Sequence, residues 1–240
     1  MLADGKKFEQ IKRAFLDALF PIHCFGCESE GVRLCADCLS SIRVMPLMLC
    51  PGCGRAAPGG RTHAACRAKT PLAALVSPYH YADPRLRGLI KEYKYHGARD
   101  IERLLSGLTA AGVRALLPFL PRAAQIVPMP LYPARERARG FNQASVLGAV
   151  VAQTLGGKME KPLSRIRRTD EQARLSVLER MENCHRAFSS APVSGICLLI
   201  DDVVTSGATM RAAAEELKKA GAHEVVGFAL AHGRGDAFRS

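Results

Sequence analysis

The 240-residue sequence predicts an α/β fold, a doubly wound parallel sheet preceded by a small cysteine-rich module. Three observations lead to this prediction. From about residue 72 onward, apolar strand-like runs alternate with amphipathic helices, a pattern typical of parallel sheets covered by helices. Four short motifs of the Cys-x-x-Cys kind crowd into residues 24–66. An apolar run at 197–200 leads into two aspartates and then into Thr-Ser-Gly-Ala-Thr at 205–209.

The elements of the predicted sheet follow from the periodicity of apolar residues. We expect strands at residues 73–81, 124–129, 196–200 and 224–231. One helix is expected to begin after Asp83-Pro84, and others to cover 101–117, 142–155 and 210–220. These strands and helices alternate along the chain, and together they define an α/β domain over residues 71–240.

Two smaller segments precede this domain. The first 21 residues predict an amphipathic helix that ends at Pro21 and carries Phe8, Ile11, Phe15 and Leu19 on its apolar face. We expect it to pack on the rest of the protein, and a membrane-surface or partner-binding helix is the alternative. Residues 22–70 contain few aliphatic side chains, so bound metal is expected to hold them together.

The composition is that of a soluble globular protein, with 48% hydrophobic and 23% charged residues. The net charge of +12 comes from 34 basic and 22 acidic residues spread along the chain. This charge favours anionic partners, which include phosphate esters, nucleic acid and anionic membrane surfaces. Apolar runs long enough for a membrane span (about 18 residues) or a secretory signal are absent from the sequence. We therefore expect a cytoplasmic protein without an integral membrane segment.

Eight candidate zinc ligands form four pairs, each with two residues between its members. The ligands are Cys24, Cys27, Cys35, Cys38, Cys50, Cys53, His63 and Cys66. Two turns of this length complete a tetrahedral zinc site. Secreted disulfide scaffolds are short chains with a secretory signal, and thioredoxin-like chemistry uses a single motif, so neither fits. Pairing in sequence order predicts two structural zinc sites, and a crossed arrangement of the first and third pairs stays open.

The segment after strand 196–200 predicts a binding loop for a phosphorylated ribose. It consists of Asp201, Asp202, Val203, Val204, Thr205, Ser206, Gly207, Ala208 and Thr209. Parallel sheets bind ligands at the carboxyl ends of their strands. Amides and hydroxyls at a helix N-terminus suit a phosphate, and ionised carboxylates accept hydrogen bonds from a ribose diol. A Walker loop and a dinucleotide-binding fingerprint are excluded, because the Gly-Lys-Ser/Thr and Gly-x-Gly-x-x-Gly patterns are missing.

Basic residues flank this predicted edge of the sheet. Arg135, Arg137 and Arg139 follow a proline-rich turn after strand 124–129 and suggest a second anion site, with a solvated basic surface as the alternative. Residues 165–186 hold six arginines against four acidic residues, which suits either a lid over an anion or a contact with nucleic acid.

Residues 197–209 resemble the phosphoribosyl-pyrophosphate (PRPP) motif of type I phosphoribosyltransferases. The chain as a whole resembles the ComF family, in which a double zinc ribbon precedes a phosphoribosyltransferase domain of this type. The resemblance rests on the four cysteine motifs, on KEYKYHG at 91–97, on RGFNQ at 139–143 and on residues 197–209. One departure is His63, where such proteins usually carry cysteine.

The resemblance implies that PRPP binds together with Mg²⁺. Asp201 and Asp202 would then be the catalytic pair at the ribose hydroxyls, residues 205–209 would hold the 5′-phosphate, and Arg135 to Arg139 would hold the pyrophosphate. Lys94 and His96 are candidates for recognising a base.

The same resemblance implies a role in DNA uptake, natural transformation or the use of external DNA, with contacts to single-stranded DNA and to proteins of the uptake machinery. Two alternatives stay open: an active phosphoribosyltransferase that transfers the pentosyl group to an unidentified nitrogenous acceptor, and a regulator that uses the same pocket as a switch. The chain has no Trp and 6% aromatic residues, so base stacking has few candidate platforms.

Overall fold

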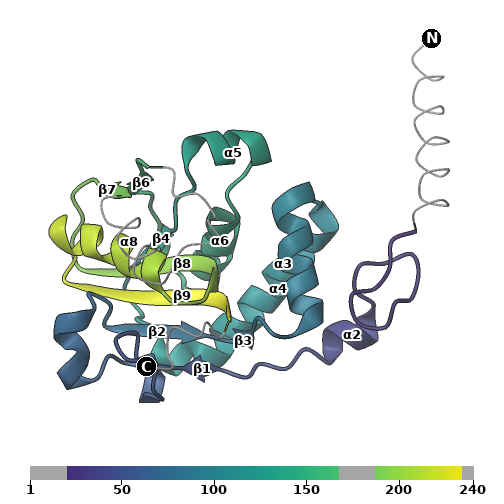
Figure 1. The fold of residues 1–240 in the computed structure, drawn as a ribbon, viewed down its shortest axis with the longest axis horizontal. Coiled ribbons are helices and arrows are strands. Elements are labelled where there is room, and N and C mark those ends of the chain that lie inside the picture. Colours follow the sequence, from purple (N-terminus) through teal and green to yellow (C-terminus); the bar gives the residue numbers. More distant parts are fainter. Residues whose placement is uncertain (1–20, 168–186, 234–240) are drawn as a thin grey trace, which may run out of the picture.

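The computed structural model describes residues 21–167 and 187–233. The predicted N-terminal helix and most of the arginine-rich segment, residues 168–186, lie outside the described residues. Figure 1 shows a twisted sheet with helices packed around it, while the cysteine-rich segment runs along the lower edge of the view.

The main sheet has seven strands in the order β1-β2-β9-β8-β4-β5, with β3 pairing with β9. Its strands are β1 (Leu47–Met48), β2 (Ala74–Ser77), β3 (Tyr79–His80), β4 (Gln125–Pro128), β5 (Lys158–Met159), β8 (Ile196–Val204) and β9 (Glu224–His232). Among the strands of this sheet that the described residues form, β1 alone runs antiparallel to its neighbour. Beside this sheet, β6 (Leu163–Arg165) and β7 (Phe188–Ser190) form an antiparallel pair. The predicted α/β class with a mostly parallel sheet is confirmed.

The helices of the described residues are α2 (Ala36–Ser40), α3 (Pro84–His96), α4 (Arg99–Leu116), α5 (Pro133–Arg139), α6 (Gln143–Leu155) and α8 (Ala208–Lys219). Short 3-10 turns lie at Pro58–Gly60, Ala64–Lys69 and Leu117–Phe119. The sequence fixes two helix starts locally. Asp83 accepts a hydrogen bond from the Arg85 amide at 2.9 Å and Asn142 accepts one from the Ala144 amide at 3.0 Å, so both are N-caps.

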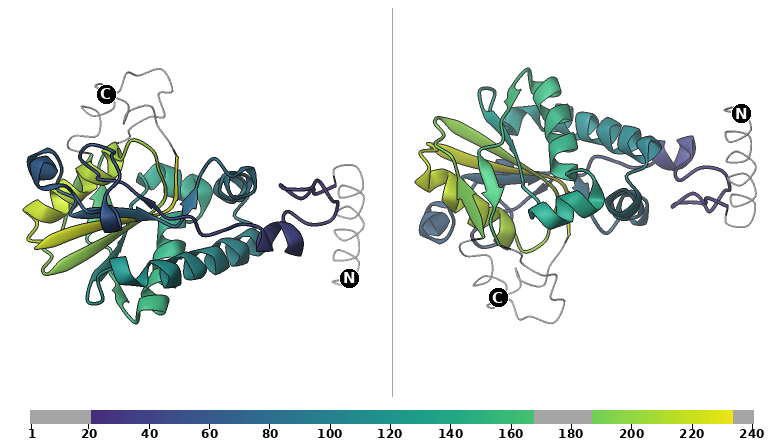
Figure 2. Two further views of the ribbon diagram at one scale, coloured as in Figure 1. Left: turned by 90° about the horizontal axis from the view of Figure 1, so that it is seen from below. Right: turned by 90° about the horizontal axis from the view of Figure 1, so that it is seen from above.

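The strands separate two hydrophobic layers, and Figure 2 shows helices on both sides of the sheet. Successive strand residues point to opposite faces. On β8, Leu198 and Ile200 pack with the layer under α3, α4 and α6, whereas Cys197 and Leu199 pack with the layer under α8. All four side chains are fully buried, which explains the uninterrupted apolar run in the sequence.

Two predicted strands differ from the observed ones. The run at 73–81 is split at Pro78 into β2 and β3, because proline has no amide hydrogen to donate to a strand ladder. β8 continues to Val204, four residues beyond the predicted end, because β9 offers it a parallel partner as far as His232. The two aspartates thus lie within the strand and not in the loop after it.

The cysteine-rich segment is connected to the main sheet, because its strand β1 pairs with β2. In Figures 1 and 2 the part around α2 (purple) lies beside α3 and α4, whereas the part at 50–70 (blue) lies at the other end of β2. The two halves of the segment therefore pack on different parts of the α/β domain.

Candidate functional site

The carboxyl end of β8 carries the predicted aspartate pair. Asp202 is 8% exposed, and its Oδ2 forms an ion pair with Lys94 Nζ at 2.8 Å. Lys94 lies on α3. Burial is the largest single effect on its pKa and lowers it, but the charge and hydrogen bond of Asp202 and the charge of Asp201 together raise the pKa overall. From the sequence, Lys94 was predicted only as a candidate for base recognition, because no local signal connects it with Asp202 on the distant strand β8.

Asp201 has different surroundings from its neighbour. Its Oδ1 accepts a hydrogen bond from the Asp202 amide at 2.8 Å. Burial, and then the charge of Asp202, raise the pKa of Asp201 to about 7, against the opposing charges of Lys94 and Arg165. Arg165 comes from β6, so elements on both sides of β8 contribute charge to this carboxyl group.

The two motifs at 91–97 and 139–143 meet beside the aspartates. The rings of Tyr93 and Phe141 lie 4.7 Å apart between centroids. Gly97 ends α3 with φ 58°, and a Cβ at this position would lie 2.7 Å from the Phe141 ring. Asn142 donates from Nδ2 to the Met129 carbonyl at 3.0 Å and so holds the start of α6 against the end of β4. These motif residues therefore act as packing elements around the edge of the sheet.

The predicted phosphate loop joins β8 to α8. Thr205 is exposed and Ser206 half-buried, and Gly207 takes φ 70° as the N-cap of α8. A positive φ of this size favours glycine. Ala208 and Thr209 form the first turn of α8, where backbone amides gather at the helix N-terminus, and the Ala208 amide donates a hydrogen bond to Ser206 Oγ at 3.4 Å. The fold thus brings the predicted residues 201–209 to one edge, in a form that can accept an anion.

Arg135, Arg137 and Arg139 lie on the short helix α5, which was not predicted; the sequence indicated only that they follow a proline-rich turn. Pro133 at its first turn and Gly140 at its C-cap, with φ 82°, are the local signals for this helix. Residues four apart share a helix face, whereas residues two apart do not. Arg135 and Arg139, both half-buried, thus face one direction, and the exposed Arg137 faces another.

A cleft of about 180 Å³ opens beside α5, between the end of β4 and β6. Lys161 and Arg165 contribute positive charge and Glu136 contributes negative charge, and Asn142 and Ser145 line the cleft from the start of α6. Of the predicted arginine-rich lid, only residues 165–167 are described, and Arg165 also lies over the Phe188 ring at 5.5 Å.

The eight predicted zinc ligands gather into two tetrads in sequence order. The first tetrad is Cys24, Cys27, Cys35 and Cys38, and the second tetrad is Cys50, Cys53, His63 and Cys66. Within each tetrad the potential ligand atoms lie within 4.8 Å of one another. The crossed pairing that the sequence left open does not occur in the structure.

The distances inside both tetrads fit zinc. A tetrahedral ion with Zn–S bonds of about 2.3 Å and Zn–N bonds of about 2.0 Å places its ligand atoms about 3.5–3.8 Å apart. Cys27 and Cys35 Sγ are 3.7 Å apart, and Cys53 Sγ lies 3.4 Å from His63 Nδ1. Sulfur and imidazole donors without an open position are typical of structural zinc, so the tetrads support two structural sites.

Backbone amides surround the sulfur atoms and favour thiolates. Hydrogen bonds from the amides of Cys27 and Cys35 lower the pKa of Cys24 to about 6. By contrast, the pKa of Cys38 is raised to about 12, first by its hydrogen bond with Cys35 and then by burial. Crowded sulfur atoms resist full deprotonation, and a bound dication relieves that repulsion.

A glycine in each tetrad makes room for the opposite ligand pair. A Cβ on Gly26 would lie 2.5 Å from Cys38 Sγ, and a Cβ on Gly52 would lie 2.7 Å from Cys66 Cβ. We therefore expect Gly26→Ala and Gly52→Ala each to reduce bound zinc from about two ions per chain to about one. Metal analysis of the purified variants measures this. Gly107→Ala is the control, because its Cβ would meet no atom within 4 Å; unchanged zinc in both tetrad variants would contradict the expectation.

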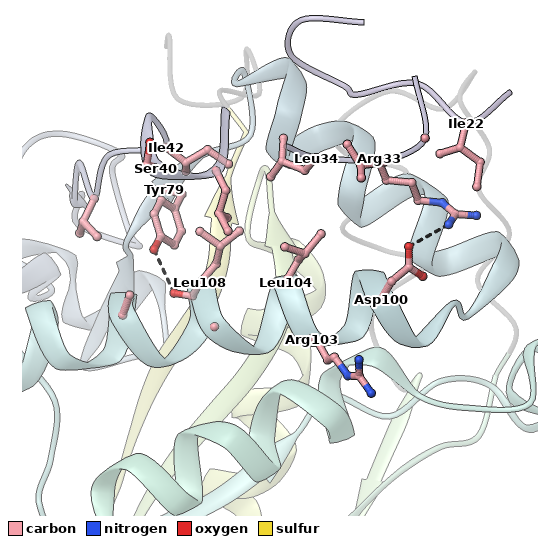
Figure 3. Close-up of a pocket in the computed structure, with 16 residues that line it drawn as sticks. Ile22, Arg33, Leu34, Ser40, Ile42, Tyr79, Asp100, Arg103, Leu104 and Leu108 are labelled. Carbon is pink, nitrogen blue, oxygen red and sulfur yellow. Dashed lines mark hydrogen bonds and ion pairs between the residues drawn. The ribbon is translucent and has the colours of Figure 1, made fainter. Parts of the chain in front are cut away.

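A separate apolar groove of about 760 Å³ lies between the first half of the cysteine-rich segment and α4 (Figure 3). Leu34 and Ile42 face Leu104 and Leu108 across it. The groove contains no ligand of either tetrad and no residue of the phosphate loop. Among the described residues, no helix combines the length and apolar character that crossing a membrane requires.

Comparisons with known proteins agree with both parts of the chain. Residues 15–67 match the double zinc ribbon domain, and residues 142–237 match the phosphoribosyl transferase domain. Competence protein F of Haemophilus influenzae is 31% identical over 224 residues, covering 88% of this chain and 95% of the relative. DNA utilization protein YhgH of Salmonella typhimurium is 34% identical over 205 residues, covering 80% and 87%.

Competence protein ComFC of Bacillus subtilis is 27% identical over 210 residues, covering 82% of this chain and 83% of the relative. These matches extend over most of this chain and most of each relative. The chain is therefore a member of the ComF family, with a double zinc ribbon joined to a phosphoribosyltransferase domain.

Proposed function

We propose that this protein binds PRPP with Mg²⁺ at the carboxyl edge of its sheet and contacts single-stranded DNA in the cytoplasm during DNA uptake or the use of external DNA. The observation that carries the proposal is the arrangement around β8, where two acidic residues precede a glycine-containing loop that leads into the N-terminus of α8. The phosphoribosyl transferase match covers this region, and the relatives are named for competence and DNA utilization.

Each part of PRPP has a proposed partner. Residues 205–209 bind the 5′-phosphate through backbone amides and hydroxyls. Asp201 and Asp202 accept hydrogen bonds from the ribose diol, and their oxygens are the hard ligands that Mg²⁺ prefers. Because Arg135 and Arg139 share a face of α5, we assign the pyrophosphate to these two and leave Arg137 for another anion.

The DNA contact is proposed to continue from the same edge along α5. Arg137 is exposed, and the cleft beside α5 adds Lys161 and Arg165. The positive charge of these side chains attracts DNA phosphates whatever the base sequence, in line with the net charge of +12. Proteins of the uptake machinery are further proposed partners, suggested by the names of the relatives.

We expect binding to single-stranded DNA to weaken steeply with salt, with a slope of about −0.7 in log affinity per neutralised phosphate. Without PRPP, all three arginines of α5 can contact DNA phosphates, so the triple change of Arg135, Arg137 and Arg139 to Ala is expected to flatten that slope by about 2. It should weaken all sequences alike, because phosphate contacts carry no base information. Fluorescence anisotropy with two oligonucleotides of different sequence, at several salt concentrations, measures both effects.

A matched triple variant tests where DNA binds. Arg55, Arg61 and Arg67 are exposed arginines of the cysteine-rich segment, and changing them to Ala removes the same charge. If this variant loses DNA affinity while the α5 variant keeps it, DNA binds the zinc module and the shared-edge proposal is wrong.

Turnover is the second candidate, because the same aspartate pair suits a phosphoribosyltransferase with a nitrogenous acceptor. Catalysis of this transfer depends on positioning and on stabilising the leaving pyrophosphate. Measuring pyrophosphate release from Mg²⁺·PRPP with single-stranded DNA, free bases and nucleotides in turn distinguishes the two. Binding without release supports a sensing or accessory role, and release with one acceptor identifies an enzyme.

A further inference from the structure

A side chain on α8 connects the phosphate loop to the second zinc tetrad. Arg211 Nη1 donates a hydrogen bond to the Ser206 carbonyl at 2.9 Å and another to the Pro51 carbonyl at 3.3 Å. Ser206 belongs to the phosphate loop, and Pro51 lies between two ligands of the second tetrad, Cys50 and Cys53. One guanidinium group therefore joins two turns that are distant in sequence, since Arg211 and Pro51 are 160 residues apart.

Both ends of this bridge are held closely. Pro51 is buried, and the neighbouring Gly52 has room only for hydrogen opposite Cys66. At the other end, the same Arg211 Nη1 would lie 3.3 Å from a Cβ on Gly207, so the guanidinium packs directly on the loop backbone. The position of the loop thus depends on a carbonyl whose own position is set by the cysteine turn.

The first tetrad has a different relation to the site. It contacts the first half of α3, where Arg85 donates a hydrogen bond to the Cys38 carbonyl at 3.5 Å and Phe25 lies against Gly88. No hydrogen bond among the described residues runs from this tetrad to residues 205–209. The two tetrads therefore offer a comparison within one chain.

From this geometry we propose that the second tetrad is part of the phosphate site, and that Arg211 is the positioning residue through which it acts. Zinc at the second tetrad fixes the position of the Pro51 carbonyl, and this carbonyl orients the Arg211 guanidinium. Arg211 in turn holds the Ser206 carbonyl and so positions the loop amides that bind the phosphate. Loss of this zinc lowers the affinity for the phosphate of PRPP, whereas loss of the first zinc does not. The inference rests on the proposed PRPP binding and adds a metal-dependent control to it.

Calorimetry with Mg²⁺·PRPP tests the bridge in the full-length protein. Arg211→Ala is expected to weaken binding about tenfold, because a charged hydrogen bond to the loop is lost. Arg211→Lys should restore it only in part, since one ammonium group does not reproduce the forked geometry of guanidinium. Lys219→Ala on the same helix is the control, because its ion pairs with Glu215 and Glu216 are exposed.

Zinc ligands provide the decisive comparison. His63→Ala is expected to lower bound zinc from about two ions to about one and to weaken PRPP binding as Arg211→Ala does. His63→Cys restores a four-ligand site and should restore both properties. Because the two residues act through one path, His63→Ala should add little to Arg211→Ala in the double variant. Cys27→Ser is expected to lose the first zinc and to keep the affinity for PRPP.

Amide hydrogen exchange of residues 203–211 gives a readout that needs no ligand. We expect faster exchange there in His63→Ala and Arg211→Ala than in wild type, and no change in Cys27→Ser. Equal exchange in all four proteins would overturn the bridge, whatever binds the pocket. Failure of the wild-type protein to bind PRPP, with the expected exchange pattern intact, would instead overturn the proposed function and leave the bridge standing.

Discussion

Chelation of zinc is expected to unfold residues 22–70 while most of the α/β domain stays folded. These residues bury few apolar side chains, and the cluster around the second tetrad consists of its own cysteines and Ala57. Metal binding therefore supplies their folding free energy, about 10–16 kcal/mol per site in zinc-finger peptides. Most residues of the sheet and of its two hydrophobic layers lie outside this segment, which adds Cys24, Leu34 and Ile42 to the edge of one layer, so most of the domain does not need the metal.

The measurement is metal analysis followed by hydrogen exchange with and without a chelator. We expect about two zinc ions per chain, and loss of protection in residues 22–70 but not in β4, β8 or β9. Strand β1 should lose protection as well, because it belongs to the cysteine-rich segment although it pairs with β2. Disulfides among these cysteines in place of zinc, or full protection after chelation, would contradict the prediction.

The sequence predicted the larger elements because their signals are local. The uninterrupted apolar run of β8 and the capping residues Asp83 and Asn142 act within a few residues of where they stand. Two-residue strands such as β1 and β5 carry no periodicity, so only their pairing partners reveal them. Helix α5 was missed although Pro133 and Gly140 flank it, because seven residues give too few turns for an apolar pattern.

The site was predictable as a set of residue types, and its connections were not. The loop at 201–209 is a continuous motif, and each zinc ligand belongs to a short local pair. By contrast, the ion pair of Lys94 with Asp202 and the bridge from Arg211 to Pro51 depend on how distant segments pack. Such contacts follow from the tertiary fold, and a single sequence contains no local signal for them.

Replacing Asp201 and Asp202 with Asn is expected to remove most of the affinity for Mg²⁺·PRPP. The change keeps the shape of each side chain and removes two negative charges, so the hydrogen bonds from the ribose diol lose their charged partner. Each such loss costs roughly 1.5–3 kcal/mol, or about ten- to a hundredfold in affinity. Calorimetry of the single and double variants measures it, and unchanged binding by the double variant would refute the assignment of this loop.

The single variants are expected to differ because the two carboxylates have different surroundings. Asp202→Asn also leaves Lys94 without its ion-pair partner, so thermal unfolding must be measured beside binding, and Lys94→Met in the same chain removes that unpaired charge.

Asp201 has a pKa raised to about 7, chiefly by burial and then by the charge of Asp202. Binding of Mg²⁺·PRPP requires the ionised carboxylate of Asp201, so below about pH 7 this group must lose a proton before the ligand binds. The affinity for Mg²⁺·PRPP is therefore expected to fall up to tenfold per pH unit as the pH drops from about 7 toward 5. Asp201→Asn removes this group and should flatten the profile, and a wild-type affinity that is constant over that range would show that Asp201 is already ionised in the free protein.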